Sequence, residues 1–136
     1  MSDPSQVRAD LKARTDIIEE AYEFFLAYAS QGLPTDANTS HPIRDHLRKF
    51  DQALNGIGAF FLESAAALGA GDLAPYRKFV GVIERDAGDA QAAIQLVLAQ
   101  PAIGSQTIDN LNASIHVRAL LTDLFLIEEI LTSLSR

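Results

Sequence analysis

The positively charged residues best suited to binding an anion or an acidic partner lie just after Pro42. Arg44, Arg48 and Lys49 gather there, near what Pro42 marks as the first turn of a helix. A helix amino terminus already carries partial positive charge, so acidic residues are expected there. Arg44 and Arg48 are four residues apart and are predicted to share an outward stripe. We interpret these three cations as a candidate contact for an anion or an acidic partner. The alternative is pairing with the acidic run upstream, Asp16, Glu19, Glu20 and Glu23.

His46 lies inside the same segment and is followed by Leu47, Arg48 and Lys49. This arrangement resembles the basic surroundings of the phosphorylated histidine in phosphotransfer domains, which are small, acidic four-helix bundles. The resemblance implies that His46 is the phosphoacceptor of a signalling adaptor. Those domains place a small residue after the lysine, which leaves the histidine accessible, whereas this chain has Phe50 there. The alternative is that His46 is a rim residue without a special role, because short motifs need confirming context.

Motifs for metal binding and catalysis are sparse. A dinuclear site in a helical bundle needs Glu-x-x-His, which does not occur, and the absence of cysteine excludes thiolate sites. Zinc would require His41, His46 and His116 to converge without the usual zinc spacing. A Gly-rich phosphate loop and a Gly-x-Ser-x-Gly elbow are also missing. We therefore predict a protein that is not an enzyme and holds no cofactor or metal, with a small-molecule or metal-binding bundle as an alternative.

The overall composition is that of one globular domain. The chain has 136 residues, 48% of them hydrophobic and 21% charged, which fits a single domain over residues 1–136. Its net charge of -7 argues against binding nucleic acid or an anionic membrane surface. The amino terminus lacks the basic start and apolar run of a secretory signal, so we expect a cytoplasmic protein.

Hydrophobic periodicity predicts four helices over residues 5–31, 42–69, 73–100 and 106–134. The second is the most regular, since large apolar residues recur after Pro42 at alternating spacings of four and three. Gly69 or Gly71 suits the left-handed residue past its end, and Asp72 can cap the next helix. Short connections near 70–72 and 101–105 make consecutive helices antiparallel neighbours. The fold expected is an all-α, antiparallel up-down-up-down four-helix bundle.

Three of these helices carry more apolar residues than one core requires. We expect the surplus to form a homodimer interface, because large exposed apolar patches mark interaction sites. The residues predicted to form it are Phe24, Tyr28, Leu96, Leu98 and Phe125. The alternative is that these faces simply fill well-buried helices.

The leading functional hypothesis is a noncatalytic assembly module, a homo-oligomeric bundle that docks a protein partner. A phosphotransfer adaptor that uses His46 is the second hypothesis. A bundle that binds a small molecule or metal between its helices is the third.

Overall fold

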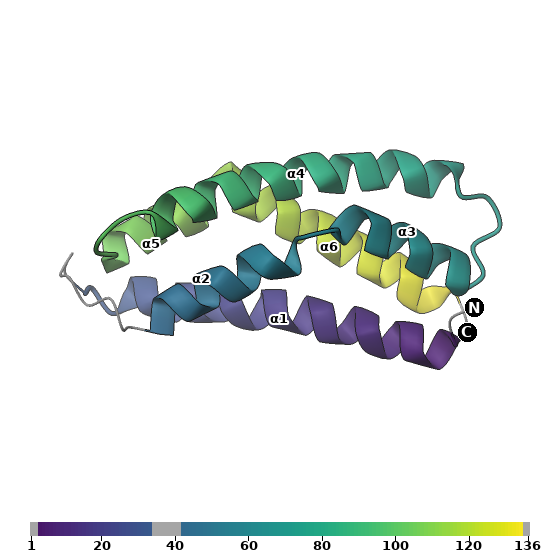
Figure 1. Ribbon diagram of the computed structural model, residues 1–136, viewed down its shortest axis with the longest axis horizontal. Helices are drawn as coiled ribbons and strands as arrows, with labels where there is room; N and C mark the ends of the chain where they lie inside the picture. The colour runs from purple at the N-terminus through teal and green to yellow at the C-terminus, as the bar shows by residue number, and fades with distance from the viewer. Residues whose placement is uncertain (1–2, 34–41, 135–136) are drawn as a thin grey trace.

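The computed structural model describes residues 3–33 and 42–134, and these residues form six helices (Figure 1). In chain order the helices are α1 Pro4–Ser30, α2 Pro42–Ala53, α3 Ile57–Ala67, α4 Ala74–Leu98, α5 Ser105–Ala113 and α6 Ile115–Ser133. The prediction of an all-α fold is confirmed for this part of the chain. None of these helices is both long and apolar enough to cross a membrane.

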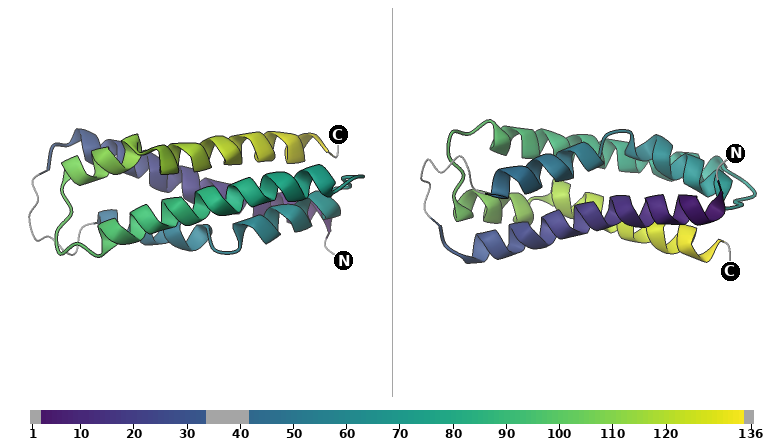
Figure 2. Two further views of the ribbon diagram at one scale, coloured as in Figure 1. Left: turned by 90° about the horizontal axis from the view of Figure 1, so that it is seen from above. Right: turned by 60° about the horizontal axis from the view of Figure 1, so that its bottom comes forward.

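The six helices lie along one common direction (Figures 1 and 2). Helix α3 continues along the side that α2 occupies, and α6 continues beyond α5 in the same way. Helix α1 packs mainly against α2 and α5, while α4 packs mainly against α6 and α3. The start of α1 and the end of α6 lie at the same end as the α3–α4 connection.

Local side-chain chemistry explains several helix boundaries. At the start of α1, the Asp3 carboxylate accepts a 3.2 Å hydrogen bond from the Ser5 amide, and Pro4 occupies the first turn. Asp72 accepts in the same way from the Ala74 amide, 3.0 Å away, just before α4. Gly69, after α3, has a φ of 95°, which suits glycine past a helix end. The cap at Asp72 and the left-handed Gly69 were predicted from the sequence, whereas the cap at Asp3 was not.

The predicted continuous helix over 42–69 is wrong, because the chain leaves the helical conformation between α2 and α3. Gly56 has a φ of 67°, a left-handed conformation that costs glycine little. Neighbouring helices supply donors to backbone carbonyls at the break. Arg14 Nη1 donates to the Asn55 carbonyl at 3.3 Å, and Gln91 Nε2 donates to the Asp51 carbonyl at 3.0 Å. The interruption is thus stabilised from both α1 and α4.

The predicted helix over 106–134 is also interrupted. Ser114 has an extended backbone, with φ of -65° and ψ of 141°, and separates α5 from α6. Its hydroxyl donates to the Leu111 carbonyl at 2.7 Å, and its amide donates to the same carbonyl at 3.1 Å. These bonds satisfy a carbonyl that the end of α5 leaves without a helical partner.

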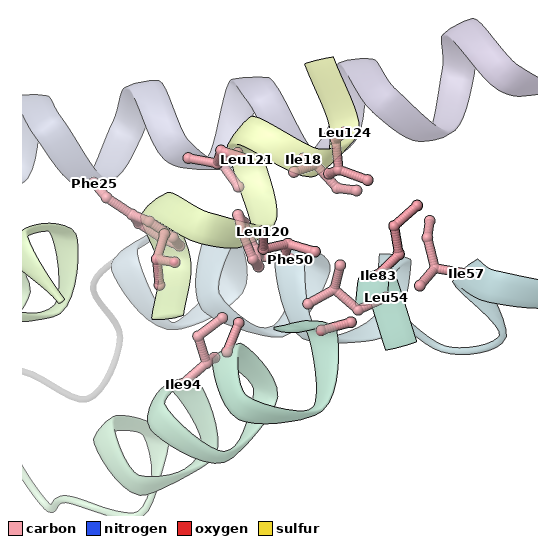
Figure 3. Close-up of a cluster of buried hydrophobic side chains, with 14 of the residues drawn as sticks. Ile18, Phe25, Phe50, Leu54, Ile57, Ile83, Ile94, Leu120, Leu121 and Leu124 are labelled. Atoms are coloured by element: carbon pink, nitrogen blue, oxygen red, sulfur yellow. The ribbon is translucent and has the colours of Figure 1, made fainter. Parts of the chain in front are cut away.

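One hydrophobic core runs between the helices (Figure 3). Its largest buried side chains come from all six helices. Those that converge in the close-up include Ile18, Phe25, Phe50, Ile83, Ile94 and Leu120. Leu54 and Ile57, on either side of the break, are both buried. The buried apolar stripe therefore continues across the break between α2 and α3.

Candidate functional site

Arg44, one of the three predicted anion contacts, points into the protein rather than outward. Its side chain is buried, with the residue only 9% exposed. Nη1 donates to the Leu98 carbonyl at 3.0 Å and Nη2 donates to the Gln100 carbonyl at 2.6 Å. These carbonyls lie at the end of α4, where the helix dipole is negative and no backbone donor follows. The outward stripe predicted for Arg44 and Arg48 is therefore wrong, because Arg44 caps a neighbouring helix.

The other two cations are exposed and point to different surroundings. Arg48 Nη1 lies 3.4 Å from Asp45 Oδ1, and both side chains are more than half exposed. Lys49 lines a groove beside α1. No salt bridge among the described residues joins these cations to the acidic run of α1, where Asp16 pairs instead with Lys12 at 2.9 Å. The structure therefore does not gather the three predicted cations into one site.

The groove beside Lys49 has a volume of about 770 Å³ and runs between α1, α2 and α3. Its apolar lining includes Ile17 and Phe60. Its charged lining mixes both signs, with Asp10 and Glu20 on α1 and Lys49 on α2. The groove therefore offers an apolar surface with a mixed-charge rim, rather than a site for a simple anion.

His46 lies in this groove and stacks on Phe24. The two ring centroids are 4.0 Å apart and the ring planes are inclined by 14°. Burial lowers the pKa of His46, and the Lys49 cation lowers it further, against weaker opposite effects of Asp45 and Glu20. The imidazole is therefore neutral at neutral pH. A neutral ring nitrogen is a nucleophile, but Phe24 covers one face of the ring.

Three of the five residues predicted to form an oligomer interface are not on the open surface. Tyr28 is buried, and its hydroxyl donates to the Ile103 carbonyl across the connection that follows α4. Phe24 is half-buried against His46, and Leu98 is half-buried at the core. The prediction that Tyr28 lies in an interface is wrong, because its hydroxyl finds a partner inside the fold.

The remaining two, Leu96 and Phe125, are 66% and 56% exposed. The end of α4 and the start of α5 lie at the same end of the bundle. Leu96 lies two residues before the end of α4, close to this end, whereas Phe125 lies twenty residues after the start of α5. At 1.5 Å per residue they are roughly 25 Å apart along the helices. The five predicted residues therefore do not form a single patch.

A different exposed apolar surface lies on α6, and the sequence-based reading missed its extent. Ile115, Leu126 and Ile130 are 72%, 50% and 38% exposed. None of these three residues is among those predicted from the sequence to form an interface. The buried face of α6 is defined by Val117, Leu120, Leu121, Leu124, Ile127 and Leu131. The spacing of these six residues is the signal that places Ile115 on the opposite side.

Two carboxylates, Asp86 of α4 and Asp123 of α6, meet where these helices pack. Burial, together with the adjacent Asp86, raises the pKa of Asp123 to about 7. Asp123 Oδ2 is enclosed and accepts no hydrogen bond from any residue that the structure describes. A proton shared between the two carboxyl groups would supply that bond. Sequence reasoning could not find this pair, since it depends on the register of α4 against α6.

Within residues 3–33 and 42–134, no group of three or more histidine, aspartate or glutamate side chains could hold a metal ion. His46 lies on α2 and His116 on α6. His41, the third histidine of the zinc hypothesis, lies outside the described residues.

Comparisons with known proteins give no functional guide. No protein family, curated protein sequence or solved structure matches the chain significantly.

Proposed function

We propose that this chain is a noncatalytic assembly module that forms a homodimer and docks a protein partner. One observation carries the proposal. Four of the seven large apolar side chains that are exposed among the described residues lie on one helix, α6: Ile115, Phe125, Leu126 and Ile130. Such a concentration is typical of an interaction surface.

The burial pattern supports the proposal. Helix α6 already buries six apolar side chains in the hydrophobic core. Its outer apolar side chains are therefore not needed to complete that core. Exposed apolar side chains scattered singly need no explanation, but several along one helix leave an apolar strip in water. Covering the strip with protein would remove the unfavourable exposure of these side chains to water.

The architecture suits such a role. We interpret the six helices as an up-down-up-down four-helix bundle in which α2–α3 and α5–α6 are each one interrupted rod. The strip on α6 is separate from the groove of α1, α2 and α3. Self-association through α6 would leave that groove free for the protein partner. The acidic composition favours a protein partner over nucleic acid, and a cytoplasmic location remains part of this proposal.

The mass of the full chain in solution tests the proposed self-association. Sedimentation equilibrium across micromolar to submillimolar concentrations should give a mass that rises from one chain toward two. A mass that stays at one chain over the whole range would refute it.

A second candidate function, phosphotransfer through His46, is favoured by a specific observation. His46 lies in the groove beside Lys49, and its lowered pKa leaves the imidazole neutral and nucleophilic. Incubation with acetyl phosphate, followed by intact mass measurement at alkaline pH, should then show one acid-labile phosphoryl group. The His46→Gln variant should not acquire it. An unmodified wild-type chain would rule this function out.

A further inference from the structure

We propose that the outer face of α6 pairs in antiparallel fashion with the same face of a second copy of this chain. The inference rests on the proposed self-association and specifies its geometry. It is carried by two features of α6, which are the order of its outer apolar residues and the distribution of its charges.

The outer face is a stripe along the whole helix. Ile115, Ala119, Leu126 and Ile130 follow one another at spacings of four, seven and four residues, with Thr122 between them. At 3.6 residues per turn these positions share one side of the helix, opposite the buried residues. Ile115 is the most exposed large apolar residue among those described, and Leu126 is half exposed. A helix that only covered its own core would be polar on this side.

The stripe is complementary to itself when reversed. If a two-fold axis passes near Thr122, Ile115 of one copy faces Ile130 of the other. Ala119 then faces Leu126, so a small side chain lies opposite a large one. A two-fold interface requires this self-complementarity, since each patch must fit its own copy.

The charges of α6 favour the antiparallel direction. Arg118 and Glu129 are eleven residues apart, which is close to three turns, so both lie along the same edge of the stripe. Neither forms a salt bridge with another residue that the structure describes. In the antiparallel pair, Arg118 of each copy lies near Glu129 of the other. In a parallel pair, the two-fold axis runs along the helices and puts the equivalent edges on opposite sides of the interface, so Arg118 of one copy would not reach Glu129 of the other.

These charges also oppose the dipole of their own helix. The first turn of α6 has no acidic residue and the last turn has no basic one, whereas the reverse arrangement would be stabilising. His116 and Arg118 instead occupy the positive end, and Glu129 lies toward the negative end. A second, antiparallel α6 brings its negative end to the basic residues and its positive end to Glu129. Pairing therefore relieves an unfavourable arrangement within each chain. Glu128 is not part of this edge, since it faces Thr15 of α1 at 3.5 Å.

One helix pair buries less than the roughly 800 Å² per partner of a standard interface, so we expect a weak, concentration-dependent dimer. Sedimentation equilibrium of full-length variants tests its geometry. Arg118→Glu should weaken the dimer on the order of tenfold, because two symmetric contacts turn from attractive to repulsive. Glu129→Arg should do the same. The double variant, with both charges exchanged, should restore the wild-type dissociation constant.

Leu126→Lys tests the apolar stripe, and Leu96→Lys is its matched control. Both leucines are exposed, so circular dichroism should show an intact helical fold for each variant. Leu126→Lys should be monomeric at concentrations where the wild type and Leu96→Lys are dimeric. A dimer that survives Leu126→Lys, or a double charge exchange that does not restore the affinity, would overturn the antiparallel pairing but leave self-association standing. A wild-type chain that never dimerises would overturn both.

Discussion

Replacing Arg44 by methionine removes the guanidinium group that ties the start of α2 to the end of α4. The substitution deletes two hydrogen bonds from a charged donor, at 3.0 Å to the Leu98 carbonyl and 2.6 Å to the Gln100 carbonyl. A hydrogen bond to a charged group contributes roughly 1.5–3 kcal/mol. Water recovers part of this loss, because Gln100 lies at the exposed end of α4. Methionine keeps most of the apolar stem. We therefore expect the free energy of unfolding to fall by about 2–4 kcal/mol.

Urea denaturation followed by circular dichroism measures this change, and Arg48→Met is the matched control. Arg48 is exposed, and its only ion pair among the described residues is with Asp45. Surface pairs of this kind contribute about 0–1 kcal/mol. The free energy of unfolding of Arg44→Lys should lie between those of the wild type and Arg44→Met, since an ammonium cannot reach both carbonyls with the same geometry. If Arg44→Met and Arg48→Met lower the unfolding free energy equally, Arg44 does not cap α4 as described.

Two further predictions concern the α2–α3 break and the carboxylate pair. Gly56→Ala should lower the unfolding free energy by about 1–2 kcal/mol, because its φ of 67° strains a residue with a Cβ. Gly71 has no positive φ and has open space around it, so Gly71→Ala should change the free energy of unfolding little in the same urea titration. For Asp123, a folded-state pKa of about 7 lies above the ordinary aspartate value of 3.8, so the folded state binds more protons between these values. This group's contribution to stability is therefore lost as pH rises from about 4 to about 7. Asp123→Asn, whose amide can donate to Asp86, should remove that loss. Thermal melts at pH 4 and pH 8 should show a higher midpoint for the variant at pH 8 only, and parallel wild-type and variant curves would contradict the shared proton.

The sequence predicted the helical class and the ends of α1 and α4 closely, because these depend on local signals. Periodic apolar residues, the cap at Asp72 and the glycine after α3 act within one or two turns. The break at Gly56 was missed because Leu54 and Ile57 keep the apolar stripe in phase across it. The Asn55–Gly56 dipeptide, typical of turns, was the local signal that could have found it.

The candidate sites depended on contacts between residues far apart in the chain, and these only the tertiary structure decided. Arg44 looked like an outward cation because its partners, the Leu98 and Gln100 carbonyls, lie more than fifty residues away. The meeting of Asp86 and Asp123, and with it the raised pKa of Asp123, likewise depends on how α4 packs on α6. The sequence by itself predicted more apolar side chains than one core requires. The tertiary structure decided which of them remain in water, because helix packing selects the face of each helix that is buried.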